Sequence, residues 1–271
     1  MQNYLINQSI AAARAGATVI HAGCIGEGGE MLLSLLREAG VDVSMIKTVN
    51  EKNGHAIIQV TKDAENSIFI YPGSNAMIDE EYVDAVLDVL DPSDIVLLQN
   101  ETSSVEYVIK RAYEKGLKVM FNPSPIKENV TRIDLNMLSY IILNSVEAKM
   151  ITGKDGKEAL EEFKRCYPEL KVILTLGSKG SVYMHGDELI FTPSFKAKAV
   201  DTTAAGDTFS GYLLSGITKG LDMTEAMRLA SLASAIAVSR HGAAHSIPTL
   251  DEVMGSLSTM TPADYDVSVL S

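Results

Sequence analysis

The chain has 271 residues, 46% of them hydrophobic, and a formal net charge of −12. This length suits one large α/β domain with a well-buried core. An acidic surface repels the phosphate backbone of nucleic acids and anionic membranes, and the sequence holds no apolar run of about 18 residues. We therefore predict a small-molecule partner, with no nucleic acid and no membrane.

The two cysteines, Cys24 and Cys166, are too few and too far apart for a disulfide framework and have no C-x-x-C spacing. The first ten residues, MQNYLINQSI, lack the basic and apolar segments of a signal peptide. These features predict reduced thiols in a cytoplasmic protein.

Short β-branched runs alternate with stretches of helical period, which is typical of a parallel sheet covered by helices. The fold class is therefore α/β, a three-layer α/β/α domain with a mostly parallel central sheet. The predicted strands are 17–26, 93–100, 117–123, 138–144 and 170–178, and the helices between them are 29–40, 104–116 and 158–168.

Two runs, HAIIQV and NSIFIY, joined by TKDAE, alternate apolar and polar residues as a half-solvated hairpin does. We expect a small β-flap at about 54–72. A second hairpin, SVYMH and ELIFT, precedes two helices, from about Asp207 to Lys219 and from about Met223 to Ser239. The predicted domain is 1–257, followed by a loose C-terminal tail, 258–271.

The segment Asp201–Gly211, DTTAAGDTFSG, lies between the strand-like run KAKAV and an amphipathic helix. The small residues Ala204, Ala205 and Gly206 leave their N–H groups open at the positive end of the helix, where a phosphate oxyanion binds readily. Asp207 at this anion hole could accept a proton from an alcohol that attacks phosphorus. A plain Asp N-cap after a turn of small residues explains the same segment.

Several motifs occur in an order that resembles the ribokinase-like (PfkB) carbohydrate kinases, from Asn7 to about Val253. DTTAAGDTFSG resembles their C-terminal signature, and INQSIAAARAGA the end of their glycine-glycine sugar motif. NSVEAKMITG, TLGSKG and SRHGAAHSIPT resemble, in turn, their N-x-x-E motif, nucleotide loop and monovalent-cation segment.

This resemblance implies an ATP-dependent sugar kinase with Asp207 as the base. It assigns Asn144 and Glu147 to the binding of Mg²⁺ and its waters, with Glu147 acting through water. An Asn helix cap with Glu in a capping box is compatible with the same residues. The implied ATP-binding residues are Asn144, Thr175, Leu176, Gly177, Ser178, Lys179, Gly180, Gly206 and Ser231. Ser231 stands where many relatives carry His or Asn.

The resemblance also implies a K⁺ site, mostly of backbone carbonyls, at Asp201, Thr203, Ala237, Arg240, Gly242 and Ser246. Asn7, Glu101 and Asp207 are the implied sugar-binding residues, and Glu101 together with the NPSP stretch at Asn122–Pro125 favours ribose. A fructokinase or nucleoside kinase of the same fold is the alternative among enzymes. A homodimer paired through the flap sheet is compatible with the family.

The chain departs from the family before Asn7, where Asn3, Tyr4, Leu5 and Ile6 replace the glycine-rich motif and no strand precedes the first helix. We expect an N-terminally truncated sheet with exposed backbone and apolar surface beside the sugar site. ATP would then bind better than sugar, and a non-catalytic nucleotide-binding remnant is a further alternative.

Three other site types are excluded by spacing. Counting G-x-G-x-x-G from Gly26 places Met31 at the third glycine, and TGKD lacks the features of a P-loop. His241 and His245 are four residues apart without the Glu of an H-E-x-x-H zinc motif.

Overall fold

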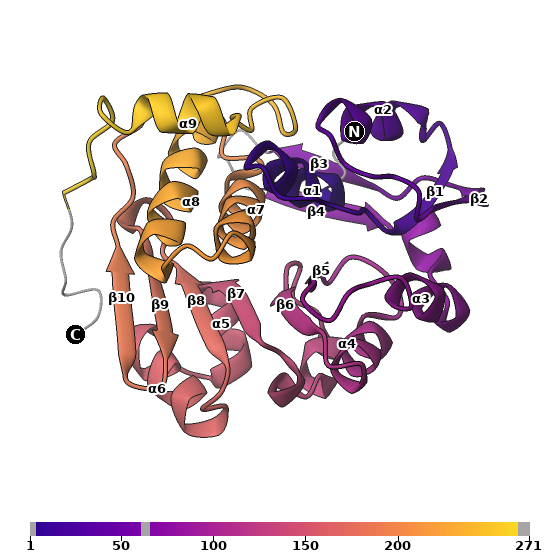
Figure 1. Ribbon diagram of the computed structural model, residues 1–271, viewed down its shortest axis with the longest axis horizontal. Coiled ribbons are helices and arrows are strands. Elements are labelled where there is room, and N and C mark those ends of the chain that lie inside the picture. Colours follow the sequence, from indigo (N-terminus) through magenta and orange to yellow (C-terminus); the bar gives the residue numbers. More distant parts are fainter. Residues whose placement is uncertain (1–3, 61–65, 265–271) are drawn as a thin grey trace.

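The computed structural model describes residues 4–60 and 66–264. Its largest element is a six-stranded sheet in the order β10-β9-β8-β7-β6-β5 (Figure 1). The parallel strands are β5 (Ile95–Gln99), β6 (Lys118–Asn122), β7 (Tyr140–Asn144) and β8 (Lys171–Thr175), and the antiparallel hairpin β9 (Ser181–His185) and β10 (Glu188–Thr192) completes the sheet. The predicted mostly parallel sheet is confirmed.

Helices cover both faces of this sheet. One core contains Val119, Phe121 and Ile141, and the other contains Met120 and Ile142, because successive side chains of a strand point to opposite faces. The first core packs against α3 (Glu80–Leu87), α4 (Val105–Glu114), α5 (Ser145–Thr152) and α6 (Gly156–Cys166). The second packs against α1 (Tyr4–Arg14), α2 (Glu30–Glu38), α7 (Ala205–Thr218), α8 (Met223–Val238) and α9 (Leu250–Ser256). The expected three-layer architecture is confirmed.

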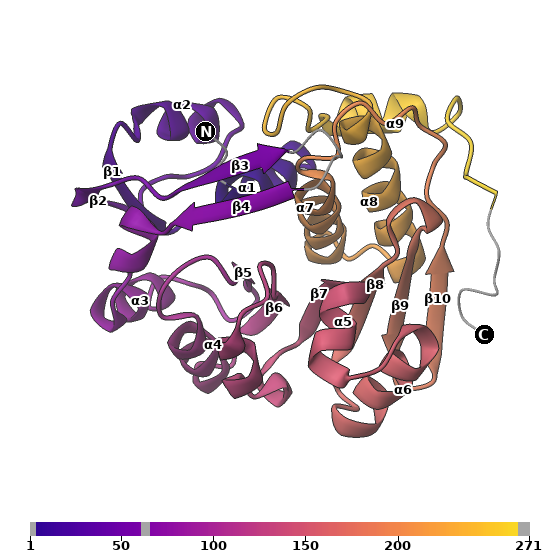
Figure 2. The ribbon, with the colours of Figure 1, turned by 180° about the vertical axis from the view of Figure 1, so that it is seen from behind.

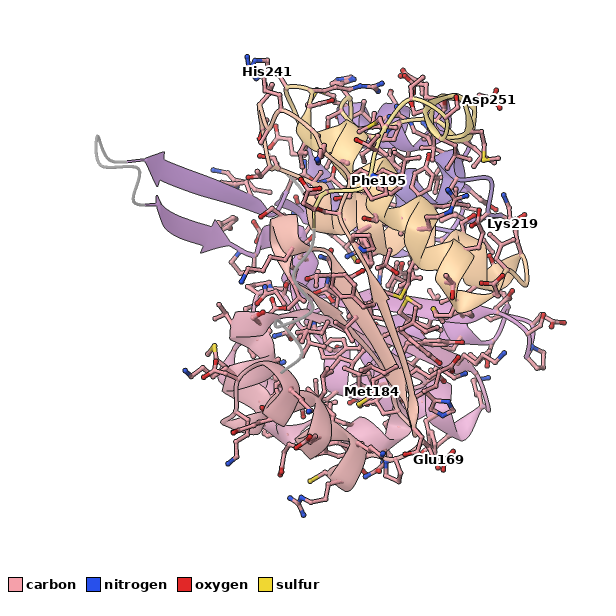
Figure 3. All side chains as sticks on the ribbon, turned by 90° about the vertical axis from the view of Figure 1, so that its left-hand side faces the viewer. Glu169, Met184, Phe195, Lys219, His241 and Asp251 are labelled. Carbon is pink, nitrogen blue, oxygen red and sulfur yellow. The ribbon has the colours of Figure 1, made fainter. Side chains whose placement is uncertain are left out.

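Two small sheets stand apart from the large one. β1 (Gly23–Glu27) pairs in parallel with β2 (Ile46–Lys52), and β3 (His55–Val60) pairs antiparallel with β4 (Asn66–Tyr71). Figure 2 shows β3 and β4 crossing in front of α1, and Figure 3 shows this hairpin extending away from the body of the protein. The predicted flap hairpin is confirmed, and its connecting residues 61–65 lie outside the described residues.

Short 3-10 helices occur in the connections, at Gly73–Met77, Glu128–Arg132, Leu135–Met137 and Gly177–Lys179. None of the described helices has the length and apolar character needed to cross a bilayer.

Strand β5 is the edge of the large sheet, and among the described strands it pairs only with β6. Its apolar residues Ile95–Leu98 are all partly exposed, whereas Val119–Asn122 of β6 are buried. Parallel strands with continuous apolar sequence are normally covered on both faces. The expected exposure of apolar surface at this edge is therefore confirmed.

Two of the predicted elements differ in the structure. The run 17–26 is not one strand, because Ile20 forms only an isolated bridge with Asp42 before β1 begins at Gly23. Helix α7 begins at Ala205, two residues before the predicted Asp207.

The expectation of a loose tail is wrong for the residues next to α9. The N–H of Lys196 donates to the carbonyl of Thr261 at 2.9 Å, and the N–H of Ala263 donates to that of Ser194 at 2.7 Å. These bonds return the chain to the end of β10. The last residues, 265–271, are not among those described.

The contact between α1 and α7 gives a stability prediction. A Cβ added at Gly211 would lie 2.5 Å from Ala11 Cβ and 2.6 Å from the Ala12 backbone nitrogen. Gly211→Ala should therefore lower the free energy of unfolding by about 1–3 kcal/mol in urea denaturation, because the two helix backbones must separate. In Gly255→Ala, the control in α9, the new Cβ meets nothing within 4 Å, and stability should stay equal or rise by about 0.5–1 kcal/mol. Equal effects of the two substitutions would contradict this account.

Candidate active site

The start of α7 forms a tight turn with free backbone N–H groups. Ala204 has φ 62°, in the left-handed region, and its carbonyl accepts hydrogen bonds from the N–H and the Oγ1 of Thr208, both at 2.8 Å. Among the described residues, the N–H groups of Gly206 and Asp207 have no backbone partner, while that of Ala205 donates to the Thr202 carbonyl at 3.2 Å. Two outward N–H groups at a helix N-terminus suit an anion.

Asp207 is buried in the first turn of this helix, with 6% of its surface exposed. Asn7 Nδ2 donates to Asp207 Oδ2 at 3.0 Å, and Gln99 Nε2 donates to Oδ1 at 3.3 Å. Burial raises the pKa of Asp207 to about 6, and the amide donors oppose that shift. A carboxylate in this environment can accept a proton near neutral pH.

Glu101 follows β5 and lies close enough to Asp207 for their charges to interact. Burial, and then the negative charge of Asp207, raise the pKa of Glu101 to about 7, while Lys127 lowers it. Near neutral pH its carboxyl can therefore either donate to or accept from a hydroxyl group. Asn7, Glu101 and Asp207 thus line one polar site, although they are far apart in the sequence.

Asn144 and Glu147 form the capping box at the start of α5. The N–H of Glu147 donates to Asn144 Oδ1 at 3.0 Å, and the N–H of Asn144 donates to Glu147 Oε2 at 2.9 Å. Glu147 Oε1 accepts from the Ser124 hydroxyl, which belongs to the NPSP stretch. The interpretation of Asn144 and Glu147 as a helix capping box is confirmed. The buried carboxylate keeps further lone pairs for a hydrated cation, and hard oxygen donors fit Mg²⁺.

The predicted nucleotide loop joins β8 to β9. Gly177 has φ 60°, and a Cβ added there would meet no atom within 4 Å. A ligand can therefore approach its backbone. A Cβ at Gly180 would lie 2.2 Å from the Thr192 carbonyl oxygen, so this glycine is needed for the packing of the hairpin. Ser231, on α8, uses its hydroxyl to donate to the Pro193 carbonyl at 2.9 Å.

Asp201 joins two loops that carry the predicted K⁺ residues. Its carboxylate accepts from the N–H of Thr203 at 2.9 Å and from the N–H of Gly242 at 3.0 Å. Hydrogen bonding by the Thr203 side chain, and then by these two N–H groups, lowers the pKa of Asp201. Ser246 is buried, and both its N–H and its hydroxyl donate to the Ala243 carbonyl. The Ala237 carbonyl accepts from the N–H of Arg240.

The described residues contain no cluster of three or more His, Cys, Asp or Glu that could hold a metal ion.

Sequence reasoning missed Gln99 and Ser124. Gln99 contacts Asp207, and Ser124 contacts Glu147. Each lies at or just after the carboxyl end of a parallel strand, the edge where α/β proteins place ligands. Their position at this edge of the sheet could have indicated from the sequence that they belong to the site.

The site can be compared with known proteins. The pfkB family carbohydrate kinase domain matches residues 5–250. The chain belongs to this family. The ribokinase of Haemophilus influenzae is 35% identical over 270 residues, which cover 93% of this chain and 88% of the relative. That of Schizosaccharomyces pombe is 34% identical, with 93% and 85% covered.

Solved structures agree with this pfkB assignment. Ribokinase from Cryptococcus neoformans in complex with ADP matches with a TM-score of 0.82 at 29% identity, covering 93% of this chain and 86% of that one. Ribokinase from Arabidopsis thaliana complexed with ribose and ATP matches with a TM-score of 0.82 at 26% identity, covering 92% and 85%. The six-stranded sheet and its helices are therefore the pfkB kinase fold.

The protonation of Asp207 gives a pH prediction for this pfkB kinase. A base must be ionised, so kcat/KM for the sugar should fall about tenfold per pH unit below the Asp207 pKa of about 6. Gln99→Leu removes a donor to the carboxylate and should move this acid limb to higher pH. Steady-state rates from pH 5 to about 8 measure the acid limb of the wild type and that of Gln99→Leu. An unchanged acid limb in Gln99→Leu would refute the role of the Gln99 bond.

Proposed function

We propose that this protein transfers the γ-phosphoryl group of ATP to the primary hydroxyl of D-ribose and forms ribose 5-phosphate. The observation that carries the proposal is the buried Asp207 carboxylate beside the free N–H groups at the start of α7, with Asn7 bonded to it. The ribokinases found as relatives support ribose as the substrate.

Asp207 accepts the proton of the sugar hydroxyl as the hydroxyl oxygen attacks the γ-phosphorus of ATP and ADP leaves. The N–H groups of Gly206 and Asp207 then stabilise the charge on the transferring group at the positive end of α7. Asn7 and Glu101 hold the sugar hydroxyls, and the backbone around Gly177 admits the nucleotide. Asn144 and Glu147 would hold hydrated Mg²⁺, which neutralises charge on the phosphates when bound.

We also propose that K⁺ binds between the loops joined by Asp201 and stiffens the turn that leads into α7. Hydrogen bonds from Thr203 and Gly242 to the Asp201 carboxylate support this coupling. The two free cysteines are compatible with a cytoplasmic location, and the protruding β3–β4 hairpin would be the dimer contact of a homodimer.

A panel of sugars tests the substrate. With ATP, Mg²⁺ and K⁺ present, ribose should give the highest kcat/KM among ribose, fructose and inosine. Preference for fructose or inosine would favour the alternative kinases of this family. Binding of ATP without turnover of any sugar would identify a non-catalytic nucleotide-binding protein. This is the main alternative to a ribose kinase, because β5, next to Glu101, is partly exposed.

Removal of the base should abolish turnover. Asp207→Asn keeps the size and the buried position of the side chain but not its basicity, so kcat should fall by about 10²–10⁴. The control is Asp222→Asn at the start of α8, where the Asp222 side chain accepts from the N–H of Glu225. Since Asn caps helices as well as Asp, this variant should keep its activity. Similar activities of the two variants would exclude Asp207 as the base.

The cation site has a readout that does not require turnover. K⁺ should raise the thermal unfolding midpoint of the wild-type chain relative to Li⁺, which holds its water more tightly. In Asp201→Asn, this difference should shrink or vanish, because the neutral amide attracts the cation less. An equal K⁺ response in both chains, measured by calorimetry, would place the cation elsewhere.

A further inference from the structure

The end of β5 carries three consecutive polar side chains. Gln99 donates to Asp207, and Glu101 lies in the same polar site. Asn100, between them, is only 1% exposed, and its side chain bonds instead to the connection that follows β6. A buried amide needs hydrogen-bond partners, so this connection has to stay beside the strand end.

Four hydrogen bonds hold Asn100 to the connection. Its N–H donates to the Ser124 carbonyl at 3.1 Å, and its Nδ2 donates to the Pro125 carbonyl at 2.9 Å and to Asn129 Oδ1 at 3.1 Å. Asn129, in the 3-10 helix Glu128–Arg132, donates back from Nδ2 to Asn100 Oδ1 at 2.8 Å. The Asn100 amide therefore uses both of its N–H groups and its oxygen.

The same connection carries groups that act on the candidate active site. The hydroxyl of Ser124 donates to Glu147 Oε1, on the side proposed for hydrated Mg²⁺. Lys127 lies near enough to Glu101 for its charge to lower the pKa of that carboxyl. The Asn100 amide therefore fixes the strand end that carries Glu101 relative to these groups.

The segment that contains Glu101 is anchored on its other side as well. The N–H of Ser103 donates to the Asn75 carbonyl at 3.0 Å, and the Ser103 hydroxyl donates to the Ile78 carbonyl at 2.8 Å. A short segment held at both ends has few alternative conformations. The backbone of Glu101 is therefore ordered before a ligand binds, which lowers the cost of binding.

We propose that Asn100 and Asn129 are positioning residues, which hold Glu101 in place for the sugar hydroxyls without contacting the sugar themselves. This inference rests on the proposed role of Glu101 as a sugar contact. A role in stability alone is the competing explanation, because a satisfied buried amide pair also supports the fold. A positioning pair acts on sugar affinity through Glu101, whereas a purely stabilising pair leaves sugar affinity unchanged.

Calorimetric titration of the whole chain with D-ribose tests the proposal and needs no turnover. Asn129→Ala breaks the amide pair but leaves Glu101 and its sequence neighbours in place. The ribose dissociation constant should rise about 3- to 10-fold, as the loss of one or two hydrogen bonds allows.

The matched control is Asn136→Ala, in the next 3-10 helix of the same connection, Leu135–Met137. Asn136 is exposed, and its Nδ2 donates to Asp134 Oδ1 at 2.8 Å. This substitution also removes an amide hydrogen bond, but one that does not reach β5. Its ribose dissociation constant should equal that of the wild type.

A double-mutant cycle with Glu101→Ala identifies the route of the effect. In the Glu101→Ala background, Asn129→Ala should change the dissociation constant by less than about twofold, because the contact through which it acts is already lost. An equal loss of affinity in both backgrounds would overturn the proposal. An unchanged ribose affinity in Asn129→Ala with a lowered unfolding midpoint would overturn it in favour of stability alone.

Hydrogen exchange of the wild-type chain decides if Asn129→Ala does not fold or if Glu101→Ala binds ribose too weakly to titrate. Ribose should slow the exchange of the backbone amides of Val130 and Ile133, next to Asn129, because the sugar orders Glu101 and the connection bonded to it. The amide of Ala159, at the start of α6, should stay unchanged. Unchanged exchange at Val130 and Ile133 would overturn the proposal.

The titration also separates this inference from the proposed function. A wild-type chain that binds no ribose would overturn the proposed substrate and this inference together. Ribose binding by the wild type that Asn129→Ala leaves unaltered would overturn the positioning role alone.

Discussion

The hydrogen bond between Asn7 Nδ2 and Asp207 Oδ2 joins two helices that are 200 residues apart in the sequence. It holds only because α1 and α7 approach closely at Gly211, where a side chain would strike the backbone of α1. Burial raises the pKa of the Asp207 carboxyl to about 6, and the Asn7 donor opposes that shift. The position of the candidate base beside Asn7 therefore depends on the close approach of α1 and α7.

Several residues of the site also serve the fold. Glu147 caps α5 and contacts Ser124, while Asp201 fastens two loops by accepting backbone N–H groups. Such side chains are held in place before any ligand arrives, which lowers the cost of ordering them on binding. The same dual use explains why a capping box and a proposed cation site can share residues.

The exposed edge of β5 lies beside the candidate active site. This strand ends at Gln99, whose amide contacts Asp207, and it borders a cavity between the strand and the segment 16–25. Its Ile95–Leu98 run has the composition of a covered parallel strand without the covering.

The sequence by itself determined the α/β class, most strands and helices, and Asp207 at the start of a helix, because these follow from local periodicity and from the chemistry of short motifs. It also indicated the capping box at Asn144 and Glu147. Tertiary structure alone decided that Gln99 contacts Asp207, that Gly180 serves packing, and that the run 17–26 divides into a bridge and β1. Each of these depends on a neighbour distant in the chain, and the pattern of residues along one segment carries no information about what packs against it.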